Sequence, residues 1–426
     1  MTTPLWRSRD FTLLWTSQVA STIGTRVTSV AYPLLVLALT GSPTQAGVVA
    51  FAQTLPYLLL YLPGGAWVDR WPRRRLMVLC ELGRAVALGS IAVVVVAGGL
   101  DAITLPQIAA VAFVEGSLFV LFDLAEGSAL PQLVPAGQVP AAVAYNQGRI
   151  QAADLVGQPL GGALFSVAPG LPFAVDAASY LLSGGAIAAI RSRLQGERAP
   201  VTTRLREQIA EGLRFVWRDR FLRDTVALIG GSNLAFNALT LVLIVRATDL
   251  GATPAQVGLM FGMYGAGGIL GALVAARAHR AIPGRVLLVG ISWLWAGLAA
   301  AYVLAPSWLE LGLLSAAASV FGPIFNVVVA AATYRVTPEG LLGRVRSAAK
   351  LVAWGTIPLA GLLGGVAAEH LGTTAALLSV AALLAAVAAL TTVSPGLHTL
   401  SGRSLASGTR PSPRPRDPAR TRRCGR

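Results

Sequence analysis

The sequence predicts an all-α integral membrane protein with about twelve transmembrane helices, each near the length needed to span a bilayer. Of its residues, 54% are hydrophobic and 12% are charged, whereas soluble domains have roughly 25% charged residues. Apolar runs of about 18 or more residues, enough to cross the hydrocarbon core as a helix, recur from end to end. Runs such as 86–97 and 374–390 show no strict alternation, so they do not fit a membrane β-barrel.

The apolar runs place the predicted spans along the chain. They cover 12–39, 46–68, 76–98, 103–124, 143–166, 172–190, 223–245, 255–276, 286–305, 308–331, 346–368 and 373–393. Residues 41–43 and 168–170 carry the Gly and Pro that are typical of tight turns between such spans.

The distribution of arginine predicts the orientation. The net charge of +15 results from 33 Arg and the single Lys350 against 19 acidic residues. Arginines gather in alternate loops, at 70–75, 191–223, 277–285 and 335–346, whereas the opposite loops hold only Arg246; loop 125–142 holds no Lys or Arg. Basic residues collect in cytoplasmic loops, so we expect both termini in the cytoplasm, an inner or plasma membrane location and no nucleic-acid partner.

An internal repeat divides the chain into two halves. Residues 134–137 and 337–340 are similar, and Gly161-Gly162 recurs as Gly364-Gly365, both at an offset of 203. We expect a six-helix half at 1–190, a cytoplasmic linker at 191–222, a second half at 223–393 and a disordered basic tail at 394–426. Parallel repeats of this kind hold a substrate site between the halves, near the middle of the membrane.

The linker contains a candidate amphipathic helix. One helical face collects Leu205, Ile209, Leu213, Val216 and Trp217, and charged residues cover the rest. This pattern predicts a helix on the membrane surface; a partly ordered linker is the alternative.

The loop after the second span resembles the signature of the major facilitator superfamily, G-x-L-A-D-R-x-G-R-R. Residues 65–75 read GAWVDRWPRRR, with Trp and Pro in place of the Leu and the second Gly. The resemblance implies a latch that holds the halves in one conformation, with Asp69 against 343–347 and Arg73 against Asp123. The residues of this predicted latch are Gly65, Asp69, Arg70, Arg73, Arg74 and Asp123. The alternative is ordinary positive charge in a cytoplasmic loop.

The fifth span contains Gly157, Pro159, Gly161 and Gly162. This stretch resembles the antiporter motif G-P-x-x-G-G, with the proline one place late. The family associates that motif with export; ordinary glycine packing is the alternative. Segments 11–15, 129–135, 176–180, 211–215 and 343–345 resemble the enterobactin-exporter and macrolide-efflux branch, and the resemblance covers about 5–393. Thr25 stands where many relatives carry an acid.

Charged residues inside spans are costly and mark candidate functional sites. Arg26, Glu115 and Asp154 lie near the middle of their spans. Arginine does not lose its proton, so Arg26 needs a carboxylate partner, either Glu115 or Asp154. We expect one acid to neutralise Arg26 and the other, with Glu115 favoured, to exchange a proton. A purely structural ion pair is the alternative.

Other charged residues in the spans are expected to have simpler roles. Glu81 and Arg84 are three residues apart and are expected to pair with each other. Asp176 and Glu310 lie near the outer ends of their spans and are expected in water. Polar residues that line the predicted cavity, or else make interhelical hydrogen bonds, are Gln18, Gln53, Asn233, Asn237 and Asn326.

Catalytic and nucleotide-binding motifs are missing from the sequence. No G-K-[ST] occurs, and neither H-E-x-x-H nor G-x-S-x-G is present. We therefore expect no enzymatic activity, no cofactor and no metal, and an ion gradient, with protons favoured, as the energy source. The predicted function is proton-coupled efflux of an amphipathic small molecule, such as a drug, macrolide or siderophore, by a monomer in the lipid bilayer. Solute uptake, lysolipid flipping and a non-transporting scaffold or sensor are the alternatives.

Overall fold

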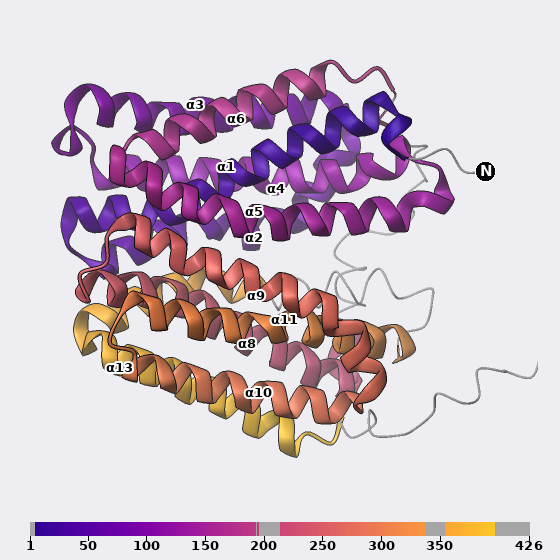
Figure 1. The fold of residues 1–426 in the computed structure, drawn as a ribbon. Helices are drawn as coiled ribbons and strands as arrows, with labels where there is room; N and C mark the ends of the chain where they lie inside the picture. The colour runs from indigo at the N-terminus through magenta and orange to yellow at the C-terminus, as the bar shows by residue number, and fades with distance from the viewer. Residues whose placement is uncertain (1–4, 193, 196–213, 337–353, 397–426) are drawn as a thin grey trace, which may run out of the picture.

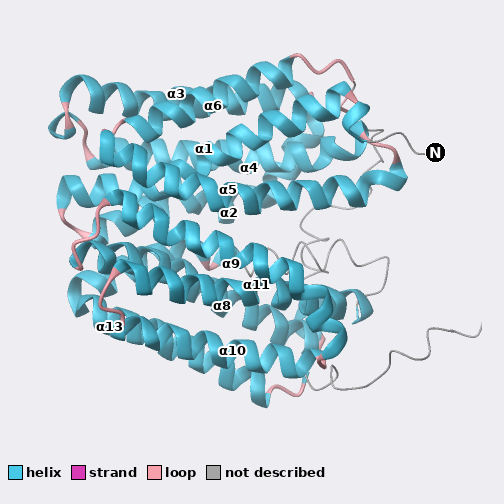
Figure 2. Ribbon diagram, viewed as in Figure 1, coloured by secondary structure: helices cyan, strands magenta, loops and turns pink. Residues whose placement is uncertain are grey.

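Helices account for the regular structure of the protein. A computed structural model describes residues 5–192, 194–195, 214–336 and 354–396, and this part of the chain contains helices and no strand (Figure 2). The first group of long helices comprises α1 (Arg9–Thr40), α2 (Pro43–Arg70), α3 (Arg73–Gly98), α4 (Leu105–Leu133), α5 (Val139–Val167) and α6 (Leu171–Ala188). The second group comprises α8 (Arg220–Asp249), α9 (Pro254–Ala281), α10 (Gly284–Ala301), α11 (Trp308–Val336) and α13 (Ile357–Val393).

These helices provide the predicted membrane crossings. Nine of them within the described residues are long and apolar enough to span a bilayer. Helix α13 holds two legs joined at Gly372, whose positive φ of 80° breaks the helix. Helices α2 and α5, at 28 and 29 residues, are also long enough to cross. The prediction of an all-α fold with twelve spans is confirmed.

Turn residues set the helix boundaries. Ser42 caps the start of α2 by accepting a hydrogen bond from Gln45 N, and Thr253 caps α9 in the same way through Gln256 N. Both helices begin with a proline, which suits the first turn. Helix α1 ends at Gly41, whose φ of 65° favours glycine. Helix α4 runs on to Leu133, so the first part of the predicted loop 125–142 is helical.

The two helix groups lie one above the other in Figure 1, α1–α6 in indigo to magenta and α8–α13 in red to yellow. They meet mainly where α5 packs against α9 and where α2 packs against α13. We call the end of the bundle with the turns at 71–72 and 282–283 the arginine-rich end, and the end with the turns at 41–42 and 250–253 the opposite end. The predicted face at 205–217 falls mostly outside the described residues, as does the tail from 397.

Candidate functional site

A cavity of about 520 Å³ lies between the two helix groups. Residues from both groups form its wall, which is mainly apolar with several amides and hydroxyls. Arg26 of α1 and Asp154 of α5 are its charged lining residues. Pockets for small molecules usually measure roughly 300–1,000 Å³, with a few polar groups in an apolar wall, and this cavity has that character.

The cavity wall contains a direct ion pair between α1 and α5. Arg26 Nε lies 2.7 Å from Asp154 Oδ1, and the two side chains are 35% and 17% exposed. Of the two carboxylates predicted as partners of Arg26, the structure therefore selects Asp154 and not Glu115. None of the guanidinium N–H groups of Arg26, Nε included, makes a hydrogen bond within the described part of the chain, so the contact with Asp154 is an ion pair only.

Glycines on α5 allow this ion pair to form. A Cβ at Gly157 would lie 2.5 Å from Arg26 Cβ and 2.8 Å from the Ile23 carbonyl oxygen. A Cβ at Gly161 would collide with the backbone of Val27. Only glycine lets α1 approach α5 this closely, and the close approach places Arg26 beside Asp154, three residues before Gly157.

The polar residues predicted for the cavity divide into three groups. Gln53, Asn233 and Asn237 line it. Gln18 is buried elsewhere, where its Nε2 donates to Glu81 Oε1 (3.2 Å) and Ser183 Oγ (2.9 Å). Asn326 is exposed and lies outside the cavity lining.

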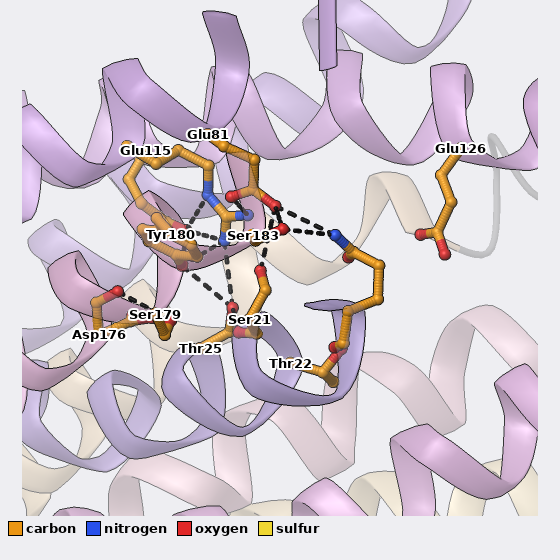
Figure 3. Close-up of polar contacts among 12 residues, drawn as sticks. Ser21, Thr22, Thr25, Glu81, Glu115, Glu126, Asp176, Ser179, Tyr180 and Ser183 are labelled. Carbon is orange, nitrogen blue, oxygen red and sulfur yellow. Dashed lines mark hydrogen bonds and ion pairs between the residues drawn. The ribbon is translucent and has the colours of Figure 1, made fainter. Parts of the chain in front are cut away.

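A second polar cluster lies inside the first helix group, around Arg84 of α3. This side chain is 2% exposed, and its Nη2 atom lies 2.8 Å from Glu115 Oε1 of α4. Arg84 Nη2 also donates to Thr25 Oγ1 (3.1 Å) and to the Tyr180 hydroxyl. Figure 3 shows Glu81, Glu115, Tyr180 and Thr25 converging.

Of two expectations about this region, one is confirmed and one is wrong. Glu81 and Arg84 do form an ion pair, with Arg84 Nη1 3.8 Å from Glu81 Oε2, and Arg84 also pairs with Glu115 at 2.8 Å. Asp176 is not in water, since it is 0% exposed. Its position near the end of its span suggested contact with water, but α1 covers it. Thr28 Oγ1 of α1 donates a hydrogen bond to Asp176 Oδ2 at 2.7 Å.

The sequence analysis did not predict that these residues form a cluster, although their helical spacing could have indicated it. Asp176, Ser179 and Tyr180 fall on one face of α6, and Thr25 and Thr28 share a face of α1. Polar residues at such spacing within two apolar spans indicate facing polar surfaces. No comparable sequence pattern predicted the ion pair between Arg149 of α5 and Glu126 of α4. Arg149 Nη1 lies 3.0 Å from Glu126 Oε1.

The predicted latch is only partly covered by the described residues. Residues 343–347 and the Asp69 side chain lie outside them. Arg73 Nη1 donates to the carbonyls of Ser128 (3.0 Å) and Leu194 (3.1 Å), and Asp123 Oδ2 accepts from the Tyr61 hydroxyl (2.8 Å). The contact of Arg73 with Asp123 stays a prediction.

The remaining latch residues have more definite surroundings. Arg74 Nη1 donates to the Ile190 carbonyl at 2.6 Å, and Arg70 is exposed. A Cβ at Gly65 would meet no described atom within 4 Å, whereas a Cβ at the neighbouring Gly64 would lie 2.9 Å from Leu124 Cδ1.

Two equivalent glycine contacts join the helix groups towards the opposite end of the bundle. A Cβ at Gly258 of α9 would lie 2.6 Å from the Gln158 carbonyl oxygen of α5, and one at Gly47 of α2 would lie 2.7 Å from the Gly361 carbonyl oxygen of α13. The second glycine of each repeated Gly-Gly pair faces the first residue of the partner helix, Gly162 against Pro254 and Gly365 against Pro43.

A polar contact accompanies each glycine contact. Ser166 Oγ of α5 accepts a hydrogen bond from Ala255 N at the start of α9 (3.0 Å). Glu369 Oε2 of α13 accepts bonds from Ser42 Oγ (2.5 Å) and from Thr44 N (2.8 Å) at the start of α2. The internal repeat found in the sequence therefore corresponds to a pseudo-symmetric closure of this end.

The sequence relatives of the chain include efflux pumps and exporters. Residues 2–414 match the family model described as transmembrane secretion effector. The multidrug efflux pump Tap of Mycolicibacterium fortuitum is 30% identical over 84% of this chain and 88% of its own length. The enterobactin exporter EntS of Salmonella typhi is 24% identical over 87% of this chain and 88% of its own length.

Solved structures of transporters share the fold. The nucleoside transporter NupG matches with a TM-score of 0.71 at 10% identity, covering 90% of this chain and 98% of that chain. A bacterial homologue of the lysosomal transporter Spinster, solved facing inward and unoccupied, matches with a TM-score of 0.68 at 15% identity, covering 95% of this chain and 100% of that chain. The family and these relatives are transporters and not enzymes. The chain belongs to the transmembrane secretion effector family of the major facilitator superfamily and is a multi-pass membrane transporter.

Proposed function

We propose that this protein is a proton-coupled exporter of an amphipathic small molecule, acting as a monomer by alternating access across the plasma membrane. The observation that carries the proposal is the cavity between the helix groups, whose mainly apolar wall contains one ion pair, Arg26–Asp154. An apolar wall suits the body of an amphipathic compound, and the ion pair with its neighbouring amides suits the polar part.

The arrangement of the helix groups supports alternating access. Backbone contacts through Gly47, Gly258, Gly162 and Gly365 close the opposite end of the bundle. With the arginine-rich end in the cytoplasm, as the arginine distribution predicts, this conformation is closed to the outside. Opening that end requires the α2–α13 and α5–α9 contacts to separate together, and the latch at 65–75 then holds the cytoplasmic end.

Buried carboxyl groups support coupling to protons. An acid beside a water-filled cavity can bind a proton on one side of the membrane and release it on the other as access alternates. Asp154 lines the cavity. Glu115 is linked to the cavity wall by a hydrogen bond, because the cavity-lining Gln53 donates from Nε2 to Glu115 Oε2 at 3.1 Å.

Accumulation assays test the proposal. Bacteria that lack their main efflux pumps would express the wild-type chain, Asp154→Asn or, as a control at the far end of a span, Glu310→Gln. We expect wild type and Glu310→Gln to lower the accumulation of at least one compound from a panel of macrolides, tetracyclines, dyes and catecholate siderophores. Asp154→Asn should abolish the effect at equal expression.

Dissipating the gradient tests the energy source. A protonophore should restore accumulation to the level of cells without the protein. Accumulation that rises when the protein is expressed would indicate uptake, and a panel without any response in either direction would contradict transport of amphipathic compounds.

A further inference from the structure

The cluster around Arg84 contains more acids than bases. Glu81, Glu115 and Asp176 are all buried, with Arg84 as the buried base among them. If all four were ionised, the cluster would carry two excess negative charges away from water. Burying an unpaired charge is very unfavourable, and such groups usually neutralise instead. At least one of the three acids should therefore hold a proton, and the hydrogen bonds indicate which.

Donors that suit a carboxylate surround Glu115 and reach one oxygen of Glu81, Oε1, whereas Glu81 Oε2 has no hydrogen-bond partner in the described structure. Glu115 accepts from Arg84 Nε (3.2 Å) and Nη2 (2.8 Å), and from the amide of Gln53. Glu81 Oε1 accepts from Gln18 Nε2 at 3.2 Å, Ser21 Oγ at 3.3 Å and Ser183 Oγ at 2.7 Å, and Glu81 Oε2 lies 3.8 Å from Arg84. Charge-assisted and amide donors of this kind stabilise the ionised form.

Among the described residues, the Asp176 carboxyl group has only hydroxyl groups as hydrogen-bond partners, and both hydroxyls have competing acceptors. The single hydrogen of Thr28 Oγ1 is also within reach of the carbonyls of Gly24 (3.3 Å) and Thr25 (3.2 Å). The hydrogen of Ser179 Oγ can go to the Asp176 main-chain oxygen at 2.8 Å instead of Oδ1 at 3.1 Å. Within the described part of the chain, Asp176 forms no ion pair.

A protonated, neutral Asp176 side chain fits the hydrogen-bond donors and acceptors around it better than a carboxylate does. Its own O–H can donate to Thr28 Oγ1 across the 2.7 Å contact, which leaves the Thr28 hydrogen for a main-chain carbonyl. Charged groups around Asp176 come from neighbouring helices, namely Arg84 of α3 and Glu115 of α4. Helix α1 contributes Thr28 and α6 contributes Ser179 and Tyr180, while no charged side chain of α5 contacts Asp176 among the described residues.

We propose that Asp176 is the proton-binding group of the transport cycle, separate from the substrate cavity, and that it is protonated in the conformation described here. This inference rests on the proposed proton-coupled export. It reassigns the exchangeable proton from Glu115, which the sequence favoured, to an acid that pairs with no cation among the described residues. Figure 3 shows Asp176 and Ser179 together, beside Tyr180.

Tyr32 provides the connection between Asp176 and the cavity. Tyr32 lines the cavity one helical turn beyond Thr28, and its hydroxyl has no hydrogen-bond partner in the described structure. Its ring packs edge-on against Phe173 of α6, with ring centroids 5.1 Å apart, three residues before Asp176. Both rings are buried, and on this proposal the pair keeps water from Asp176 while the opposite end is closed. Opening that end brings water to Tyr32 and allows Asp176 to exchange its proton.

Infrared spectroscopy of the purified full-length protein in lipid nanodiscs tests where the proton is. We expect the wild type to show the C=O stretch of a neutral carboxylic acid, shifted in heavy water and lost in alkaline buffer. Asp176→Asn, which keeps the size of the side chain in the tight contact with Gly24, should lack this band at neutral pH, where exposed carboxyl groups are ionised. Glu81→Gln and Glu115→Gln should retain it. A band that persists in Asp176→Asn, or one that is lost in Glu81→Gln, would overturn the assignment.

Transport by proteoliposomes tests the role of that proton. The probe is an amphipathic fluorescent dye that the wild type accumulates when a pH gradient is imposed. Asp176→Asn should exchange the dye down its own gradient at the wild-type rate, whereas its pH-driven accumulation should fall to that of protein-free vesicles. Wild-type accumulation by the variant, or loss of exchange in folded variant protein, would refute the coupling role. A wild type without pH-driven transport would contradict the proposed function and leave the infrared result to stand alone.

Discussion

Replacing Gly365 by valine should open the end of the bundle that is closed in this structure. A Cβ at Gly365 would collide with the Pro43 carbonyl oxygen and lie 3.3 Å from Gly47 Cα. Both obstacles are backbone atoms at the start of α2, so neither can rotate away as a flexible side chain would. The collision exists only while α2 and α13 are in contact, so the substitution destabilises one conformation and leaves the other unstrained.

The size of the effect follows from the cost of overpacking. Inserting a bulky side chain into a packed contact costs about 1–3 kcal/mol. A differential free energy of about 1–3 kcal/mol shifts a two-state equilibrium by roughly 5- to 150-fold. The pseudo-symmetric substitution Gly162→Val, which meets Pro254 and Gly258 of α9, should shift the equilibrium in the same direction.

Cysteine accessibility measures this shift. Thr240→Cys places a thiol on the cavity wall, in a background where Cys80 and Cys424 are replaced by alanine. An impermeant maleimide is applied from each side of oriented membrane vesicles. We expect Gly365→Val to raise the labelling rate from the opposite end of the bundle about 5- to 150-fold and to lower it from the arginine-rich end.

Gly290→Val is the matched control. It introduces the same side chain into α10, where a Cβ would meet no described atom within 4 Å. Labelling by this variant should equal that of wild type. If Gly365→Val and Gly290→Val label alike from both sides, the glycine contact does not control access and the reasoning from the closed end fails.

Four other variants test topology, latch and buried charge. An impermeant reagent should label Ser42→Cys in intact cells and miss Arg74→Cys, and the reverse pattern would invert the orientation. Asp69→Asn should slow transport at unchanged expression because it removes a contact of one conformation; normal turnover would exclude the latch. Arg84→Met should destabilise the protein by about 3–5 kcal/mol by leaving Glu115 buried without its cation, measured as loss of thermal stability, and an unchanged melting temperature would contradict a structural role for this pair.

The sequence alone determined the helices and their approximate ends. A bilayer requires about 20 apolar residues for each crossing, so span length is a local property that the hydropathy pattern records. The repeat at an offset of 203 also came from sequence, and it predicted equivalent places in the two halves, Gly162 and Gly365, that the structure shows in equivalent contacts.

Only the tertiary structure decided which charges meet. The depth of Arg26 in its span left both Glu115 and Asp154 as candidate partners, because depth does not specify the direction in which a helix face points. Helix packing paired Arg26 with Asp154 and gave Glu115 to Arg84. It also buried Asp176, which position alone had placed in water. Whether a side chain contacts water, lipid or protein depends on the helices packed around it. In this chain those helices come from segments more than a hundred residues apart, such as α1 and α6.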